Sequence, residues 1–236
     1  MTTGTDTVGL PGLDTWGWPA EGDVARVSRA LLDGEPVRLA MYPVRPIPPL
    51  PVSDAGDLVL AVTDRVVEAD VVLRPPSLVL GIGASRGVKV EELEELVVTT
   101  LAAHGLSTLS VAHVATVEAK ADEGGIVGLC NKTGWPLVTH PAAVLAATEV
   151  PNPSQHPLDA VGTPSVAEAA ALQHGELVVE KTKSPMATLA VARVPVRGRL
   201  SVVGLGPGAR DLLTPRAVEA LRSSSVWVGL DQYVAQ

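Results

Sequence analysis

The chain has 236 residues, a formal net charge of −8 and one cysteine, Cys130. The acidic balance excludes binding of nucleic acid through a broad basic face, and a single cysteine excludes both an internal disulfide framework and a multi-cysteine metal site. Hydrophobic residues make up 46% of the chain but aromatic residues only 3%, which predicts an α/β fold with a core of small aliphatic side chains.

The first 75 residues carry interrupted patterns. Residues 1–20 show no hydrophobic period, so we expect them to be the tail of a larger domain. Apolar residues at helical spacing predict a helix over 21–34 that ends at Gly34. Short strands are predicted at 37–40, 58–63 and 71–73. The proline-rich segment Pro43–Pro51 is predicted to be a connector, with a PxxP ligand for another protein as the alternative.

Stronger periodic signals begin at Ser77. The predicted elements are, in order, a strand at 78–82, a glycine-rich turn at 81–87, a helix at 90–103, a strand at 111–117, a helix at 124–132, a strand at 137–139 and a helix at 142–147. Ser165 and Glu168 then form a capping-box pattern that starts a helix running to about Gln173. Segments 177–180 and 187–194 predict a hairpin.

The pattern restarts near the C-terminus. A strand is predicted at 200–205, a Gly/Pro loop at 206–211, a helix at 214–222 and a strand at 226–230. One such unit cannot bury both faces of its sheet. We therefore expect the beginning of a further α/β domain whose remainder is missing.

Two other classes of protein are excluded by the pattern along the chain. No apolar run reaches the roughly 18 residues that a transmembrane helix needs, and the N-terminus lacks the basic and apolar regions of a signal peptide. We therefore expect a cytoplasmic protein. The five histidines form no HxxxH or HExxH pair, so no metal site is predicted.

The first loop with chemical potential follows the strand at 78–82. Gly81, Gly83 and Gly87 could present backbone N–H groups to an anion, and Arg86 favours a carboxylate. The spacing is not that of the dinucleotide fingerprint. The alternative is a tight turn before a well-capped helix.

The second loop, after the strand at 111–117, brings three charged side chains together in the sequence. Lys120 could neutralise an anion or polarise a carbonyl, and Asp122 or Glu123 could act as a base. The alternative is a solvated loop in which Asp122 caps the next helix.

Two later segments could also bind an anion. Asn152 and Ser165 belong to a proline-rich loop, and Ser165 is better explained as a helix cap than as a nucleophile because no GxSxG elbow is present. Lys181, Lys183 and Ser184 lie at the predicted hairpin turn, where a solvated turn is the equal alternative.

The last candidate loop contains a GxGxG string after a predicted strand. Its members are Gly204, Gly206, Pro207 and Gly208. Such a string alone is weak support for any particular ligand.

Together these strings resemble the CbiG/CobE family of cobalamin-biosynthesis proteins. Leu80–Gly87, Lys120–Glu123, Val150–Ser154, Gly162–Glu168 and Lys181–Ser184 occur in the order seen in that family's C-terminal domain, here over about residues 76–195. Residues 1–75 look like the end of its N-terminal domain and its linking middle region. The family loop often reads GIGCR, whereas Ala84 stands at the cysteine position here, so a thiol is not required there.

Residues 198–236 resemble the start of precorrin-3B C(17)-methyltransferase, a member of the tetrapyrrole methylase family. The string VVGLGPGARDLLTPRAVEAL carries the likeness, although Ala209 stands where that family often has an aspartate. The resemblance implies one complete CbiG/CobE C-terminal α/β domain. A partial N-terminal and middle region would precede it, and the first βαβ unit of a methylase domain would follow.

The resemblance implies two chemistries. CbiG-type proteins open the δ-lactone of cobalt-precorrin-5A and release acetaldehyde, and the methyltransferase transfers a methyl group from S-adenosylmethionine to precorrin-3B with ring contraction. S-adenosylmethionine is therefore implied for the methyltransferase only, no cofactor is implied for the hydrolase-like domain, and cobalt arrives with the substrate.

Roles for individual residues rest on chemistry and matching position, because the family pattern does not assign them. Asp122 or Glu123 would be the base and Lys120 would stabilise the oxyanion. Arg86, Lys120, Lys181 and Lys183, with the N–H groups of Gly81–Gly87, would bind the carboxylates of a corrinoid.

Two alternatives remain open. One is a non-catalytic tetrapyrrole carrier of CobE type that serves the fused methyltransferase, and the other is a generic α/β domain whose loops are only structural. The expected partner is a corrinoid or precorrin intermediate, with no nucleic acid and no membrane. Oligomer formation through the methyltransferase domain is left open.

Overall fold

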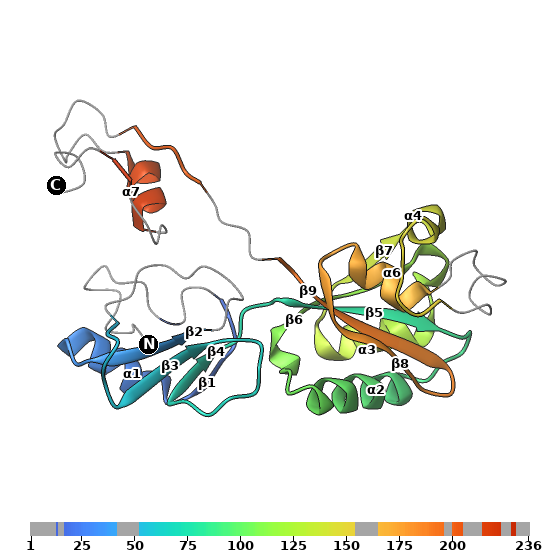
Figure 1. Ribbon diagram of the computed structural model, residues 1–236, viewed down its shortest axis with the longest axis horizontal. Coiled ribbons are helices and arrows are strands. Elements are labelled where there is room, and N and C mark those ends of the chain that lie inside the picture. Colours follow the sequence, from blue (N-terminus) through green and yellow to red (C-terminus); the bar gives the residue numbers. More distant parts are fainter. Residues whose placement is uncertain are drawn as a thin grey trace.

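The computed structural model describes residues 13, 17–41, 52–153, 165–195, 200–204, 214–222 and 228–229. These residues form two mixed sheets, each with its own helices (Figure 1). The structure is therefore of the α/β class that the composition predicts. No helix within these ranges is both long enough and apolar enough to cross a membrane.

The first sheet is small and lies near the N-terminus. Its strand order is β1 (Ala20–Gly22), β4 (Val71–Leu73), β3 (Leu58–Val62), β2 (Val37–Met41), and only β1 runs antiparallel to its neighbour. Helix α1 (Val24–Asp33) packs on this sheet, begins at Asp23, whose side chain accepts the Arg26 N–H, and ends at Gly34 in the left-handed region.

The N-terminal region has a core of its own. Val27 and Leu31 of α1 pack with Leu60, Val62 and Leu73 of the sheet. The sequence led us to expect a tail and a linking region here, and the described residues add to that expectation a sheet with a hydrophobic core. The proline-rich segment Pro43–Pro51 lies outside the described residues.

The second sheet has five strands in the order β7-β6-β5-β9-β8. Their bounds are β5 (Leu78–Ala84), β6 (Val111–Val117), β7 (Leu137–His140), β8 (Glu176–Lys183) and β9 (Ala187–Arg193). Strands β5, β6 and β7 are mutually parallel, and β9 runs antiparallel to both β5 and β8. Four strands therefore end at the same side of the sheet, which we call the carboxyl edge.

Helices cover both faces of this sheet (Figure 1). On one face α2 (Val90–Ala103) and α3 (Gly124–Thr133) bury Leu80, Ile82 and Leu189 in an aliphatic core. On the other face α4 (Ala142–Ala146) and α6 (Val166–Leu172) pack on Val79 and Ala115. The remaining elements are the 3-10 turns η2 (Thr108–Ser110) and η3 (Glu118–Lys120) and helix α7 (Pro215–Arg222).

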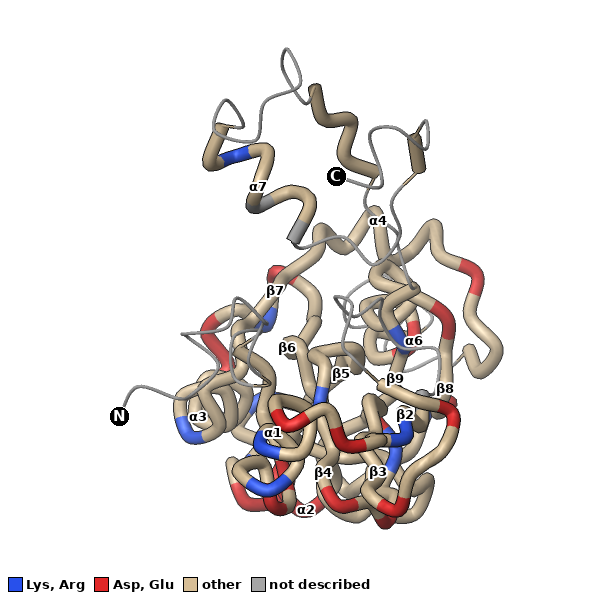
Figure 2. The backbone as a smooth tube through the Cα atoms, turned by 90° about the vertical axis from the view of Figure 1, so that its left-hand side faces the viewer, with Lys and Arg blue, Asp and Glu red and all other residues tan. Residues whose placement is uncertain are grey.

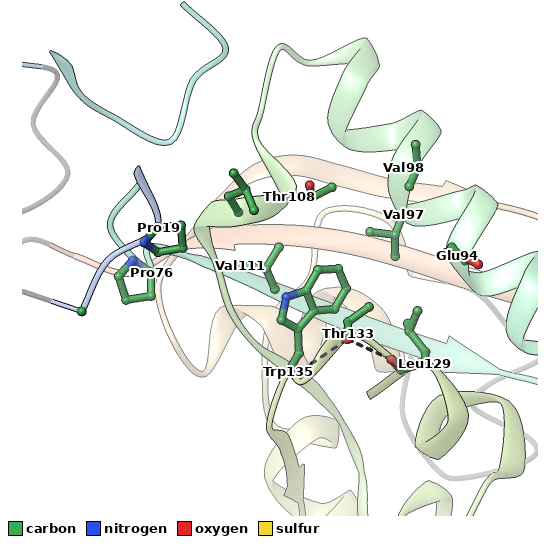
Figure 3. Close-up of a pocket in the computed structure, with 12 residues that line it drawn as sticks. Pro19, Pro76, Glu94, Val97, Val98, Thr108, Val111, Leu129, Thr133 and Trp135 are labelled. Atoms are coloured by element: carbon green, nitrogen blue, oxygen red, sulfur yellow. Dashed lines mark hydrogen bonds between the residues drawn. The ribbon is translucent and has the colours of Figure 1, made fainter. Parts of the chain in front are cut away.

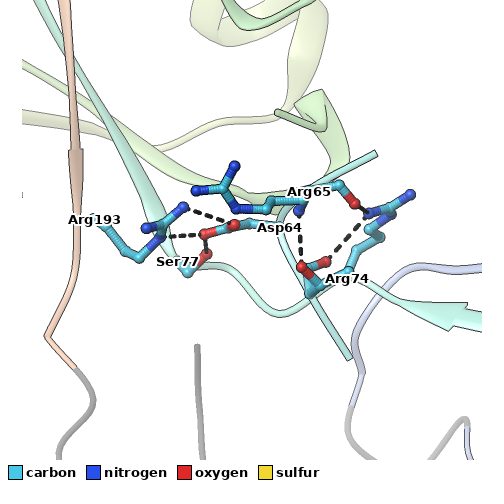
Figure 4. Close-up of polar contacts among 6 residues, drawn as sticks. Asp64, Arg65, Arg74, Ser77 and Arg193 are labelled. Atoms are coloured by element: carbon cyan, nitrogen blue, oxygen red, sulfur yellow. Dashed lines mark hydrogen bonds and ion pairs between the residues drawn. The ribbon is translucent and has the colours of Figure 1, made fainter. Parts of the chain in front are cut away.

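An ion pair with a buried carboxylate joins the two sheets. Asp64, which follows β3 and is 1% exposed, accepts hydrogen bonds from Arg193 Nε at 2.6 Å and Nη2 at 2.9 Å (Figure 4). The hydroxyl of Ser77, just before β5, donates to the same carboxylate at 2.9 Å. Arg74 is also buried and pairs with Glu21 while donating to the Thr63 and Arg65 carbonyls. The junction is thus a network of satisfied charges.

Two helix starts differ in detail from the sequence analysis, in which the cap by Asp122 was an alternative. Ser165 precedes α6 as expected, but its hydroxyl makes no capping hydrogen bond, and Glu168 turns away to bind two other segments. Asp122 does not cap α3, because Glu123 occupies the N-cap position and its side chain makes no capping bond either. The carboxylates of Glu168 and Glu123 bind other segments in place of their own helix N-termini.

The strand predicted at 200–205 is not formed over the described residues 200–204. Leu200 and Val202 are 91% and 93% exposed, and within the described ranges no strand pairs with this segment. Helix α7 agrees with the helix predicted at 214–222. Most of the loop at 206–211 and of the strand at 226–230 lies outside the described residues.

Candidate functional site

The carboxyl edge gathers candidate residues of three separate segments. Arg86 follows β5, Lys120 and Glu123 follow β6, and Lys181, Lys183 and Ser184 lie at the end of β8. This arrangement agrees with the rule that α/β sheets place ligands beyond the carboxyl ends of their strands.

The glycines at the end of β5 allow a helix to approach. The strand continues to Ala84, so Gly81 and Gly83 lie within its ladder and only residues 85–87 form the turn. A Cβ at Gly81 would stand 2.0 Å from the Ala167 carbonyl oxygen of α6, and one at Gly83 would stand 2.7 Å from Thr188 Oγ1. Both glycines therefore let α6 lie directly on the strand.

The segment after β6 forms an ion pair with the turn. Glu123 accepts hydrogen bonds from the Gly87 N–H at 2.7 Å and from Lys120 Nζ at 3.1 Å. Burial opposes ionisation of Glu123, but the hydrogen bonds from Gly87 and Lys120, with the nearby charge of Arg86, outweigh it and lower its pKa. The ionised carboxylate is a weak proton acceptor. Asp122 is exposed beside it.

Glu92 of α2 holds the turn between β8 and β9. Its Oε1 accepts the Ser184 hydroxyl at 2.6 Å and the Met186 N–H at 2.7 Å. The hydrogen bond from Ser184, then that from Met186, lowers the pKa of Glu92. Ser184 is therefore used to fix the hairpin to α2.

Glu168 was predicted from the sequence to be part of a helix cap. In the structure it accepts hydrogen bonds from two segments of the candidate site. Its fully buried carboxylate accepts Asn152 Nδ2 at 2.8 Å, the Asn152 N–H at 3.2 Å and the Lys181 N–H at 3.2 Å. Asn152 Nδ2 also donates to Glu180 at 2.9 Å. Both amide hydrogens of Asn152 thus bind within the protein, which leaves its Oδ1 as the group a ligand could meet.

Two of the cations predicted for the site have no ion-pair partner among the described residues. They are Arg86 and Lys183, and both are exposed. Lys181 donates from Nζ to the Asn152 carbonyl oxygen, and burial, aided by Lys183, lowers its pKa against the opposing effect of Glu168. Glu118 and Asp122 are also exposed nearby. Elsewhere basic and acidic positions are interspersed along the chain (Figure 2).

A histidine cluster lies on the α6 face and was missed in the sequence. His140 Nε2 and His174 Nε2 are 2.9 Å apart, and the His113 and His174 ring centroids are 4.3 Å apart. Burial lowers the pKa of all three, that of His174 to about 4. The positions are too far apart in the sequence to form a motif. Over the described residues, no three His, Cys, Asp or Glu side chains are arranged to hold a metal ion.

A separate apolar cavity of about 510 Å³ lies at the opposite end of the sheet (Figure 3). Pro76 and Val111, at the starts of β5 and β6, line it together with Val97 of α2 and Trp135. Trp135 points toward Val111 and Val97 in this view. None of the residues predicted for the site lines this cavity.

The GxGxG loop contributes little to the described structure. Gly204 is exposed, and a Cβ added there would meet no heavy atom within 4 Å. Gly206, Pro207 and Gly208 lie outside the described residues.

Comparisons with known proteins agree with the geometry of the sheet. The family described as cobalamin synthesis G C-terminus matches residues 78–192, which include all five strands of the second sheet except the last residue of β9. Protein CobE of Sinorhizobium sp is 34% identical over 121 residues, which cover 49% of this chain and 79% of that protein. The chain belongs to the CbiG/CobE family.

This CbiG/CobE chain is also similar to a second curated relative and to a solved structure. Cobalt-precorrin-5A hydrolase of Priestia megaterium is 32% identical over 135 residues, which is 56% of this chain and 36% of the hydrolase. The chain thus spans about a third of that relative. The crystal structure of CobE, from the cobalamin biosynthetic pathway, shares 34% identity and has a TM-score of 0.48. The match covers 53% of this chain and 96% of that one.

Proposed function

We propose that the carboxyl edge of the five-stranded sheet binds a corrinoid intermediate that carries free carboxylates. The proposal rests on the hydrogen bonds that the acidic side chains at this edge accept from the protein. Glu92, Glu123 and Glu168 all accept N–H or O–H donors of the protein itself. Arg86 and Lys183 thereby remain exposed to pair with ligand carboxylates, which an acidic protein can bind only through such a local site.

The spacing of the two cations suits a large ligand. Lys183 pairs in register with Thr188, and Thr188 pairs with Gly83. Lys183 is therefore two strand spacings, or roughly 10 Å, from β5. Arg86 and Lys183 can thus engage carboxylates on different parts of one macrocycle.

The test measures binding of cobyrinic acid, a corrinoid with free carboxylates, and of cobinamide, whose carboxylates are amidated. We expect the full chain to prefer cobyrinic acid. Arg86→Ala and Lys183→Ala should each weaken its binding about five- to tenfold, because a charge-assisted hydrogen bond contributes roughly 1–1.5 kcal/mol. Lys132→Ala, on α3 and away from this edge, is the control. Equal affinity for the two corrinoids would refute the proposal.

We further propose that the bound corrinoid is cobalt-precorrin-5A and that its δ-lactone is opened here, as the hydrolase relative suggests. Water adds to the lactone carbonyl, the ring C–O bond breaks, and a carboxylate and an alcohol form. The alcohol then loses its O–H proton and becomes a C=O group as its C–C bond to the macrocycle breaks. The electron pair of that bond and a proton go to the macrocycle carbon, which releases acetaldehyde. The Lys120 ammonium would stabilise the oxyanion, and Glu123 would hold Lys120 in place. Incubation of the chain with cobalt-precorrin-5A should release acetaldehyde, and Lys120→Met should slow that release. Binding without acetaldehyde would favour the carrier function.

Finally, we propose that residues 198–236 are the beginning of a tetrapyrrole methylase domain. The exposure of Leu200, Val202 and Val228, each above 90%, supports this because apolar side chains of that kind require a sheet to bury them. The surroundings of Gly204 are open, so the described residues do not form an S-adenosylmethionine pocket. The chain alone should not transfer a methyl group to precorrin-3B. Methylated product would show that residues 198–236 suffice for transfer and are not only the beginning of such a domain.

A further inference from the structure

We propose that Glu168 positions the cationic end of β8, and Lys183 in particular, for binding at the carboxyl edge. The functional part of this inference rests on the proposed corrinoid binding, whereas the structural part does not. Glu168 is on α6, and the groups it binds belong to the segment after α4 and to β8.

The Glu168 carboxylate is buried and needs hydrogen-bond donors. Glu168 is 0% exposed, and a buried carboxylate is costly unless its oxygens are hydrogen-bonded. The three N–H donors from Asn152 and Lys181 supply those bonds. Neither segment can move away from α6 without leaving this charge unsatisfied.

The β8–β9 hairpin is irregular where Lys181 lies. The pairing of β8 with β9 passes from Val179 opposite Val191 to Thr182 opposite Leu189, so β8 has one extra residue in this stretch, besides an earlier one between Leu177 and Val179. Such a bulge frees a backbone N–H from the ladder. The Lys181 N–H is the one that Glu168 accepts. The carboxylate therefore substitutes for the missing strand partner.

The bulge in β8 also determines the direction of the side chains that follow it. Thr182 faces α2, because its Oγ1 lies 3.1 Å from Thr100 Oγ1. Successive residues of a strand point to opposite faces, so Lys181 and Lys183 point to the α6 face. Removal of the extra residue from the bulge would reverse the faces of the residues that follow. By holding the bulge, Glu168 fixes the face on which Lys183 stands.

The first experiment needs no ligand. Amide hydrogen exchange is measured residue by residue on the full chain and on Glu168→Gln, Glu168→Asp and Glu180→Gln. We expect Glu168→Gln to speed exchange at Lys181 and Asn152 at least tenfold, because the carboxamide cannot accept all three donors. Glu168→Asp should give an intermediate increase. Glu180→Gln is the matched control, since Glu180 is exposed and does not accept the Lys181 N–H. Unchanged exchange at Lys181 in Glu168→Gln would overturn the proposal.

The second experiment tests whether Glu168 acts through Lys183. Cobyrinic acid affinity is measured for Glu168→Gln, Lys183→Ala and the double variant. We expect Glu168→Gln to weaken binding about fivefold alone and to add less than twofold when Lys183 is already alanine. Equal losses in both backgrounds would overturn the link to Lys183. Absence of cobyrinic acid binding by the wild-type chain would refute the proposed function, and the exchange data would still decide the positioning of β8.

Discussion

The absence of a side chain at Gly81 determines how closely helix α6 can approach strand β5. A side chain there would meet the Ala167 carbonyl oxygen at 2.0 Å, and backbone cannot rotate away as a flexible side chain can. We expect Gly81→Ala to lower the free energy of unfolding by about 1–3 kcal/mol, the range typical of overpacking. Gly124→Ala is the control, since its Cβ would meet nothing within 4 Å, and its effect should stay within ~0.5 kcal/mol. Denaturant unfolding measures both, and equal losses would contradict this account.

The histidine cluster should make stability depend on pH. Burial, with the neighbouring histidines, lowers the pKa of His174 from 6.5 to about 4 in the folded chain. The unfolded chain therefore binds protons more readily, so the stabilisation is complete above pH 6.5 and is lost as the pH falls toward 4. Glu118 acts in the opposite direction on His140, but burial is the larger effect.

The corresponding variant is His174→Asn, which cannot become positively charged in this range. Thermal unfolding from pH 7.5 to 4.5 should show a shallower loss of stability for this variant than for the wild type. His104→Asn lies outside the cluster, at the end of α2, and should retain the wild-type slope. A wild-type slope in His174→Asn would show that the cluster is not responsible.

At the scale of elements, Glu92 connects α2 to the β8–β9 hairpin. Glu92→Gln should speed amide exchange at Met186, because a carboxamide accepts the Ser184 and Met186 donors more weakly than a carboxylate does. Glu91→Gln, one residue earlier and exposed, is the matched control. Since the pKa of Glu92 is lowered in the folded chain, the protection of Met186 in the wild type should also fall as the pH drops below 4.5. A pH-independent rate, after correction for intrinsic exchange, would contradict this.

Elements with a strong period could be predicted from the sequence, and contacts between distant segments could not. Helix α2 has the predicted bounds, Val90–Ala103, because its apolar residues recur at helical spacing. The Ser165–Glu168 pattern misled because a capping box and a buried carboxylate use the same residue types. The histidine cluster and the bulge in β8 depend on pairing between segments, which leaves no local spacing to recognise.

The candidate site was predicted in outline. The segments containing Arg86, Lys120 and Lys183 were chosen because they follow predicted strands, and the structure brings them to one edge. Sequence patterns could not show that Lys120, Ser184 and Asn152 bind carboxylates of the protein itself. Those bonds decide which cations remain exposed.

At the scale of the whole molecule, the Asp64–Arg193 pair couples the two sheets. Removal of Asp64 leaves Arg193, whose side chain is 24% exposed, without its carboxylate partner, so Asp64→Ala should cost about 1–3 kcal/mol. The control is Asp33→Ala, because the Arg29–Asp33 pair is 85% and 56% exposed and should contribute only about 0.5 kcal/mol. Urea unfolding monitored by tryptophan fluorescence compares the two variants. A loss near that of the control would show that the junction does not stabilise the molecule.

The position of β9 between β5 and β8 has a consequence for synthesis on the ribosome. β5 pairs with β9 along its whole length, from Leu78 opposite Arg193 to Ala84 opposite Ala187, across more than a hundred residues of chain. A nascent chain that has already exposed β5, β6 and β7 still presents an open strand edge in the middle of its future sheet. Completion of the domain therefore waits for nearly the last residue of the hairpin, and chains released before Arg193 should aggregate or require chaperones.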